Sequence, residues 1–173
     1  MELPLEAWHD FYLTIGAGAA AVLGATFVVA TLSANIPQRT IGLKGFITPT
    51  AVHLGSVLVG SVILLMPTLD IVQATLIFLI GGVAGAIYCV VIWTRIHPMN
   101  IDLIDRFWYA AFPTLCYAAL AAGGILVWRA DDFAFELFGL AFVALTITGV
   151  RNAWDMATFM VMFEEGKPPP PKD

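Results

Sequence analysis

Charged residues are scarce in this sequence. Only 12% of its 173 residues are Asp, Glu, Lys or Arg, whereas 60% are hydrophobic. Because roughly a quarter of the residues in soluble domains are charged, this composition excludes an ordinary soluble protein. The chain is also acidic, with a net charge of −5, and its eight basic residues are scattered. These features argue against nucleic acid as a partner and favour the lipid bilayer.

Groups that could hold a metal or a cofactor are also few. Cys89 and Cys116 each lie inside an apolar run, with no second cysteine or histidine at metal-binding spacing. The sequence has no HExxH, no GxSxG and no phosphate-binding loop. His53 is the one deep histidine, whereas a dihaem cytochrome needs pairs of them. We therefore predict no metal, no cofactor, no enzymatic activity and no disulfide between the two cysteines.

Long apolar stretches are what the sequence has in abundance. Five of them are long enough to cross the roughly 30 Å hydrocarbon core of a bilayer as helices. Thr48 and Pro49 are expected to open the second helix, and Pro67 to close it. None of the stretches alternates apolar and polar residues as a membrane barrel does. The sequence therefore predicts an all-α, polytopic membrane bundle with about five transmembrane helices. The stretches are 11–34, 46–67, 71–93, 107–128 and one that begins at Phe133.

The basic residues indicate how the chain is oriented. Lys and Arg in short loops stay in the cytoplasm. With five spans, Arg129 lies alone on one side, so we expect the N-terminus outside and the C-terminus in the cytoplasm. The chain then has a short external segment (1–10), a transmembrane bundle (11–163) and a proline-rich cytoplasmic tail (164–173). The basic residues of the expected cytoplasmic side are Arg39, Lys44, Arg95, Arg106, Arg151, Lys167 and Lys172.

Small residues recur at four-residue spacing, which is about one helical turn. In lipid, such stripes let two helix backbones approach closely, and this close packing drives helix association. The stripes are therefore expected to pack helices within the chain or between subunits. The predicted packing residues are Gly16, Ala20, Gly24, Gly81, Gly85, Ala119 and Gly123.

Polar residues inside the apolar stretches are the candidate functional residues. Arg151, Asn152 and Asp155 interrupt the fifth stretch, and Arg151 can pair with Asp155 because they are four residues apart on one helix. In the second helix, His53 lies about one and a half turns from the cytoplasmic end, with Thr50 about one turn away. Both groups belong to the cytoplasmic half of the bilayer, so they can meet.

The depth of the pair decides how these residues are interpreted. A charge deep in the bilayer is costly and usually marks function, whereas at the interface Arg151 would be an ordinary anchor. The sequence leaves both positions open. Similarly, His53 could relay protons, sense pH or bind a ligand, or it could simply be a neutral buried histidine. We treat Thr50, His53, Arg151, Asn152 and Asp155 as candidates for a polar path or gate.

Three segments carry a family resemblance. Residues 8–12 (WHDFY), 46–53 (FITPTAVH) and 151–155 (RNAWD) resemble an uncharacterised family of small bacterial inner-membrane proteins, some of which are described as modulators of the FtsH protease. The resemblance covers most of the chain. It implies a location in the bacterial inner membrane, and it brings no catalytic or binding residues with it.

Two functional hypotheses follow from these observations. In the first, the protein is a small oligomeric ion channel or transport-type protein, and the polar cluster in the cytoplasmic half lines or gates its path. In the second, it is a noncatalytic accessory or regulatory subunit of a larger membrane complex, for example of a membrane protease. The first hypothesis rests on the cost of polar groups in apolar helices, and the second on the small-residue stripes.

Overall fold

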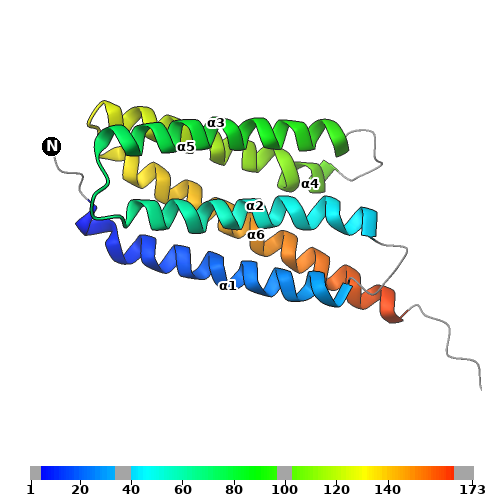
Figure 1. Cartoon of the computed structure of the whole chain (residues 1–173). Helices are drawn as coiled ribbons and strands as arrows, with labels where there is room; N and C mark the ends of the chain where they lie inside the picture. The colour runs from blue at the N-terminus through cyan, green and yellow to red at the C-terminus, as the bar shows by residue number, and fades with distance from the viewer. Residues whose placement is uncertain (1–4, 34–39, 97–102, 166–173) are drawn as a thin grey trace, which may run out of the picture.

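The computed structural model describes residues 5–33, 40–96 and 103–165. They form a bundle of long helices with three short helical segments (Figure 1), and no strand occurs in these ranges. The predicted all-α bundle is therefore confirmed. The long helices are α1 (His9–Ser33), α2 (Thr40–Leu64), α3 (Ile71–Ile96), α5 (Phe112–Trp128) and α6 (Phe133–Glu165). The short segments are η1 (Glu6–Trp8), α4 (Leu103–Arg106) and the π-helical η2 (Phe107–Ala111).

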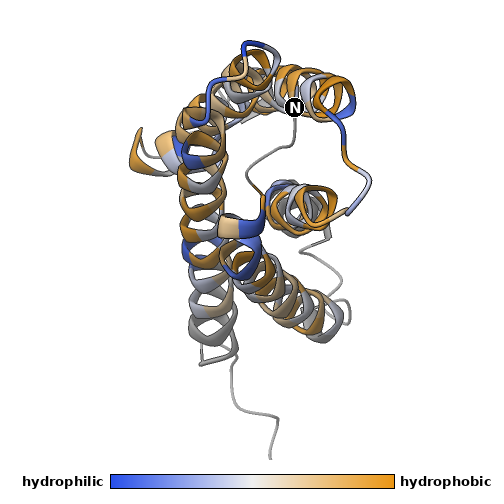
Figure 2. Ribbon diagram, turned by 90° about the vertical axis from the view of Figure 1, so that its left-hand side faces the viewer, coloured by the Kyte–Doolittle hydropathy of each residue, from blue (hydrophilic) through white to orange (hydrophobic). Residues whose placement is uncertain are grey.

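The helices indicate a membrane protein by their length and composition. Four segments within the described ranges are long and apolar enough to span a bilayer: Glu6–Thr31, Ile71–Thr94, Phe107–Trp128 and Phe133–Asp155. The segment Thr48–Leu64 of α2 is also apolar but shorter. Large apolar side chains such as Ile80 and Leu140 point outward, and apolar residues cover most of the helices in Figure 2. Such a surface suits lipid, whereas large apolar patches are rare on soluble monomers.

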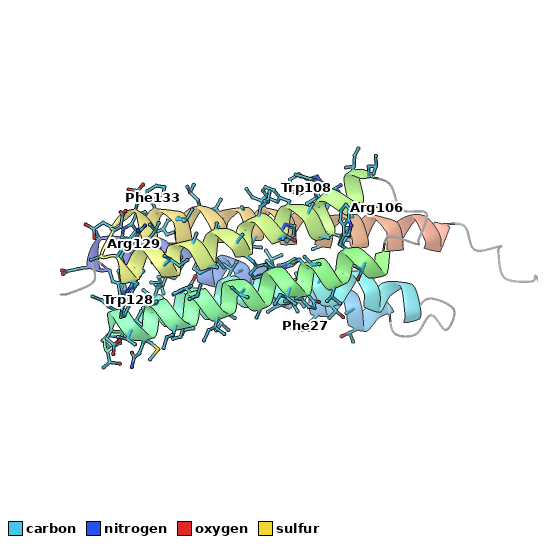
Figure 3. The ribbon with its side chains drawn as sticks, turned by 90° about the horizontal axis from the view of Figure 1, so that it is seen from above. Phe27, Arg106, Trp108, Trp128, Arg129 and Phe133 are labelled. Atoms are coloured by element: carbon cyan, nitrogen blue, oxygen red, sulfur yellow. The ribbon has the colours of Figure 1, made fainter. Side chains whose placement is uncertain are left out.

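The longest helix, α6, organises the bundle. It packs against α1, α2 and α5, while α3 packs on α5 and α2 packs on α1. The neighbours in sequence α2 and α3 make little direct contact with each other. Figure 3 shows Arg106 and Trp108 at one end of the bundle and Trp128 and Arg129 at the other. We call these ends the Arg106 end and the Arg129 end.

Aromatic side chains fill the core on the inner face of α6. Phe138 is fully buried, and its ring stacks on Phe78 of α3 with the ring centroids 4.1 Å apart. The ring also lies directly over Gly123 of α5, where any side chain would collide with it. Tyr12 of α1 donates a hydrogen bond of 2.6 Å to the carbonyl of Phe135. These contacts join α1, α3 and α5 to α6.

Glycines let α3 and α5 approach at the level of their backbones. A Cβ at Gly124 would lie 2.8 Å from the backbone nitrogen of Leu79, and one at Gly82 would lie 2.7 Å from the carbonyl oxygen of Tyr117. In contrast, Gly81 has nothing within 4 Å of an added Cβ. Close backbone contact is the expected basis of helix association in lipid, and here it depends on Gly82 and Gly124.

Some of the other predicted packing residues contact a neighbouring helix, and others face open space. Gly16 packs against the side chain of Ser61, and Gly85 packs against the ring of Tyr117. Gly24 faces open space. Ala20 and Ala119 are half-buried. The four-residue stripes therefore contain intrachain contacts, at Gly16, Gly85 and Gly123, and free positions, at Gly24 and Gly81.

Two prolines occupy different positions in their helices, one inside α2 and one at the start of α5. The prediction that Thr48 and Pro49 open the second helix is wrong, because α2 begins at Thr40 and contains Pro49. Proline is tolerated inside membrane helices because neighbouring groups satisfy the freed backbone. Before α5, the amide of Phe112 bonds to the carbonyl of Phe107, five residues earlier. Pro113 follows this wider turn, which relieves the clash between a proline ring and the carbonyl four residues before it.

Parts of the predicted terminal segments lie outside the described residues. The external segment 1–10 is described from Leu5, and the tail 164–173 is described to Glu165, where α6 ends. Arg39, Lys167 and Lys172 also lie outside these ranges. The orientation of the bundle in a membrane therefore stays a prediction.

Candidate functional site

A buried chain of hydrogen bonds connects α2 to α5. His53 is fully buried, and its Nδ1 lies 3.1 Å from the hydroxyl of Tyr117. That hydroxyl lies 2.9 Å from Oγ of Ser56, which donates to the carbonyl of Val52 at 2.8 Å. Because Ser56 has one proton and directs it to Val52, Tyr117 donates to Ser56 and His53 donates from Nδ1 to Tyr117. The Nε2 of His53 is then an acceptor.

Two buried polar groups near this chain lack a hydrogen-bond partner. Neither His53 Nε2 nor the side-chain amide of Asn152 has one among the described residues. Leu54 packs over Gly149, and Phe142 packs against Gly60, so α2 and α6 run antiparallel and Asn152 lies at the height of the Thr50–His53 turn. Leaving a buried polar group unsatisfied costs about 1–3 kcal/mol. The Nε2 of His53 and the amide of Asn152 therefore remain as polar groups without a partner in the buried part of the described bundle.

Arg151 and Asp155 form the ion pair that their spacing predicts. Arg151 Nη1 lies 3.2 Å from Asp155 Oδ2, and the two side chains are 27% and 41% exposed. The guanidinium also lies over the ring of Trp108, 5.1 Å from its centroid. The pair thus touches η2 on one side and faces outward on the other.

The position of Trp108 favours the interface for this pair. Trp108 lies in the first turn of the apolar segment Phe107–Trp128. From Phe133 to Arg151, α6 rises by roughly 27 Å, which is close to the roughly 30 Å thickness of the hydrocarbon core. We therefore expect Arg151 and Asp155 near the membrane boundary at the Arg106 end, with Arg151 about level with His53 across α2 and α6.

The structure thus divides the predicted cluster into two parts. Thr50, His53 and Asn152 are fully buried, whereas the side chains of Arg151 and Asp155 are partly exposed. The sequence reasoning missed Ser56 and Tyr117. Ser56 lies one turn after His53 and could have been found from that spacing. Tyr117 lies in another apolar stretch, and nothing local links it to His53. We call Thr50, His53, Ser56, Tyr117 and Asn152 the polar site.

Breaking the Arg151–Asp155 pair should cost little. We expect a coupling free energy of about 0.5 kcal/mol, because partly exposed pairs four residues apart on a helix are weak. Unfolding free energies of Arg151→Gln, Asp155→Asn and the double variant in detergent would give this coupling. A value above about 2 kcal/mol would instead indicate a desolvated pair inside the bilayer.

The remaining candidate groups do not gather into a site. Cys89 and Cys116 are free and buried. Among the described residues, no three His, Cys, Asp or Glu side chains are placed to hold a metal ion. His9 contacts Asp10 at 3.2 Å, and both side chains are exposed; they lie at the Arg129 end, because the start of α1 packs beside the start of α6.

Comparison with protein-family models, curated proteins and solved structures finds no match for this chain. The family resemblance of 8–12, 46–53 and 151–155 therefore stays a prediction. The function has to be argued from the chemistry of the polar site and its surroundings.

Proposed function

We propose that this protein is a transport-type membrane protein in which the polar site conducts protons or small monovalent ions. The observation that carries the proposal is the pair of buried, unpartnered groups at His53 Nε2 and Asn152. Such groups destabilise an apolar bundle unless a polar partner satisfies them. A histidine can accept a proton on one ring nitrogen and release one from the other.

The proposed path begins at the Arg106 end. Arg151 and Asp155 form its mouth at the membrane boundary, and Asn152 follows next to Arg151 in the chain. The path continues through His53 to the hydroxyls of Tyr117 and Ser56, which lie 2.9 Å apart. By the charge bias of the loops, we assign the Arg106 end to the cytoplasm, and by the family resemblance we assign the protein to a bacterial inner membrane.

The protein is proposed to work as a homo-oligomer. Ala17, Gly18 and Ala21 form an exposed face of α1, and nothing lies within 4 Å of a Cβ added at Gly18. A second copy can approach such a face closely. The same face supports the second candidate function, an accessory subunit. In that case the exposed face of α1 packs against a helix of a larger membrane complex. The two candidates differ in whether the isolated protein conducts.

Flux measurements on reconstituted protein test the proposal. Liposomes with wild-type protein should conduct protons or a monovalent ion, and His53→Leu should reduce that flux by about a hundredfold, as loss of a proton-transferring group does in catalysis. His9→Leu is the matched control, because His9 is exposed at the opposite end, and its flux should equal that of wild type. If folded wild-type protein conducts none of these ions, the accessory-subunit function replaces this proposal.

A further inference from the structure

A groove lies between α2 and α3, and its lining residues come from α2, α3, α5 and α6. Its volume is about 360 Å³, which is in the range of small-molecule sites. Val59 and Ile63 of α2 form one wall, and Ile77 of α3 forms the other. Phe142 of α6 lies at its base, where it packs against Gly60.

The groove exists because α2 and α3 pack on different partners. α2 packs on α1 and α6, whereas α3 packs on α5. Glycines leave space in the groove because they have no side chain. Gly55 and Gly81 both line the groove, and a Cβ added at either would meet no atom within 4 Å. Because both walls belong to apolar helices at the surface of the bundle, the groove is accessible from the bilayer.

Two of the residues that line the groove carry hydroxyls. Ser56 and Tyr117 line it together, and both belong to the hydrogen-bond chain that starts at His53. Ser56 accepts from Tyr117, and Tyr117 accepts from His53, so each hydroxyl keeps one free lone pair. Of these two acceptors, the half-buried Ser56 is the more accessible to an incoming donor, because Tyr117 is only 2% exposed.

The lining also defines which headgroup fits. It contains no charged side chain, and a charged group at this depth would be costly. A phospholipid headgroup is therefore excluded, while a neutral O–H can donate to Tyr117 or Ser56. The apolar walls suit a hydrocarbon body.

We propose that the groove binds a single-chain amphiphile with a hydroxyl headgroup, which enters sideways from the bilayer and donates a hydrogen bond to Tyr117 or Ser56. This inference goes beyond the proposed transport function, because it assigns a ligand that approaches from lipid. The bound hydroxyl extends the chain that begins at His53.

Photolabelling tests this assignment in phosphatidylcholine nanodiscs. The probe is a sixteen-carbon alcohol with a diazirine in its chain, and the matched probe is the alkane that lacks only the hydroxyl. We expect the alcohol to label the groove walls on α2 and α3 about fivefold more than the alkane, because one hydrogen bond contributes about 1 kcal/mol. Tyr117→Phe or Ser56→Ala should remove most of this preference.

Glycine variants provide the steric control. Gly81→Leu fills the groove without meeting another atom at its Cβ, so it should fold and lose labelling by both probes at least tenfold. Gly24→Leu adds the same side chain to open space on α1 and should label as wild type does. Labelling needs no flux, so this assignment and the transport function can fail separately.

Three results would overturn the assignment. Equal labelling by the alcohol and the alkane would show that only bulk lipid chains occupy the groove. Unchanged labelling of Gly81→Leu would place the probe elsewhere. A crosslink between two copies through Val59→Cys and Ile77→Cys, formed at the expense of labelling, would assign the groove to a second copy of the chain.

Discussion

Phe138→Ala is expected to lower the free energy of unfolding by about 3 kcal/mol, the low end of the range for Phe→Ala in a core. The ring is fully buried between Phe78 and Gly123, so its removal leaves a cavity where α3, α5 and α6 meet. We expect the low end of this range because an unfolded membrane helix stays in apolar surroundings. The change in free energy then comes mainly from lost packing contacts. Titration with a denaturing detergent in mixed micelles would measure it.

Phe133→Ala is the matched control for this prediction. Phe133 lies on the same helix, at the Arg129 end in Figure 3, and its side chain is half exposed. Its removal should change the free energy of unfolding by less than about 0.5 kcal/mol, as for other surface substitutions. Equal losses in the two variants would contradict the packing described for Phe138.

Gly82→Ala should have the second-largest effect, a loss of about 1–3 kcal/mol from overpacking. The new methyl group would press on the backbone of α5 at Tyr117 and Ala121, and backbone can yield only if the helices separate. Gly81→Ala adds the same methyl group one residue earlier, where nothing lies within 4 Å. It should stabilise the helix by about 0.5–1 kcal/mol, as alanine does relative to glycine.

The two alanine variants can be compared in one experiment. Their midpoints in the same detergent titration should lie on opposite sides of the wild-type value. If Gly82→Ala were as stable as wild type, α3 and α5 would not be in backbone contact. The contrast does not depend on the unfolded state, because both changes replace glycine with alanine in neighbouring positions.

Much of the bundle could be predicted from the sequence because lipid imposes a simple length rule. A run such as 107–128 must cross the bilayer as a helix, and the structure has this span with the same limits. Pro49 misled the prediction, because proline rules come from helices in water, where no neighbour satisfies the freed carbonyl. The pair Gly81 and Gly82 shows another limit. Four-residue spacing identified the helix but not which of two adjacent glycines faces α5.

The candidate site could be predicted only in part for a similar reason. His53 and Asn152 stand out because they are polar in apolar sequence, and Arg151 and Asp155 because they are charged. Tyr117 does not stand out, since tyrosine is common in membrane helices and its partner lies 64 residues away. The groove between α2 and α3 exists because these two helices do not pack on each other. The local sequence of a helix does not predict which helices it contacts.

The π-helical turn at Phe107–Ala111 sets the rotational phase of the whole fourth span. In a regular helix, Trp108 and Tyr117 would point in opposite directions, roughly 180° apart at 100° per residue. The wider turn absorbs about one residue, so the two side chains come to within roughly 80° of each other. The continuous helix of η2 and α5 can therefore present Trp108 to Arg151 and Tyr117 to His53 at once. The one extra residue of the π-helical turn thus brings Trp108 and Tyr117 toward the same side of the span. Deleting that residue would separate the Arg151–Asp155 pair from the buried hydroxyls without changing any of these side chains.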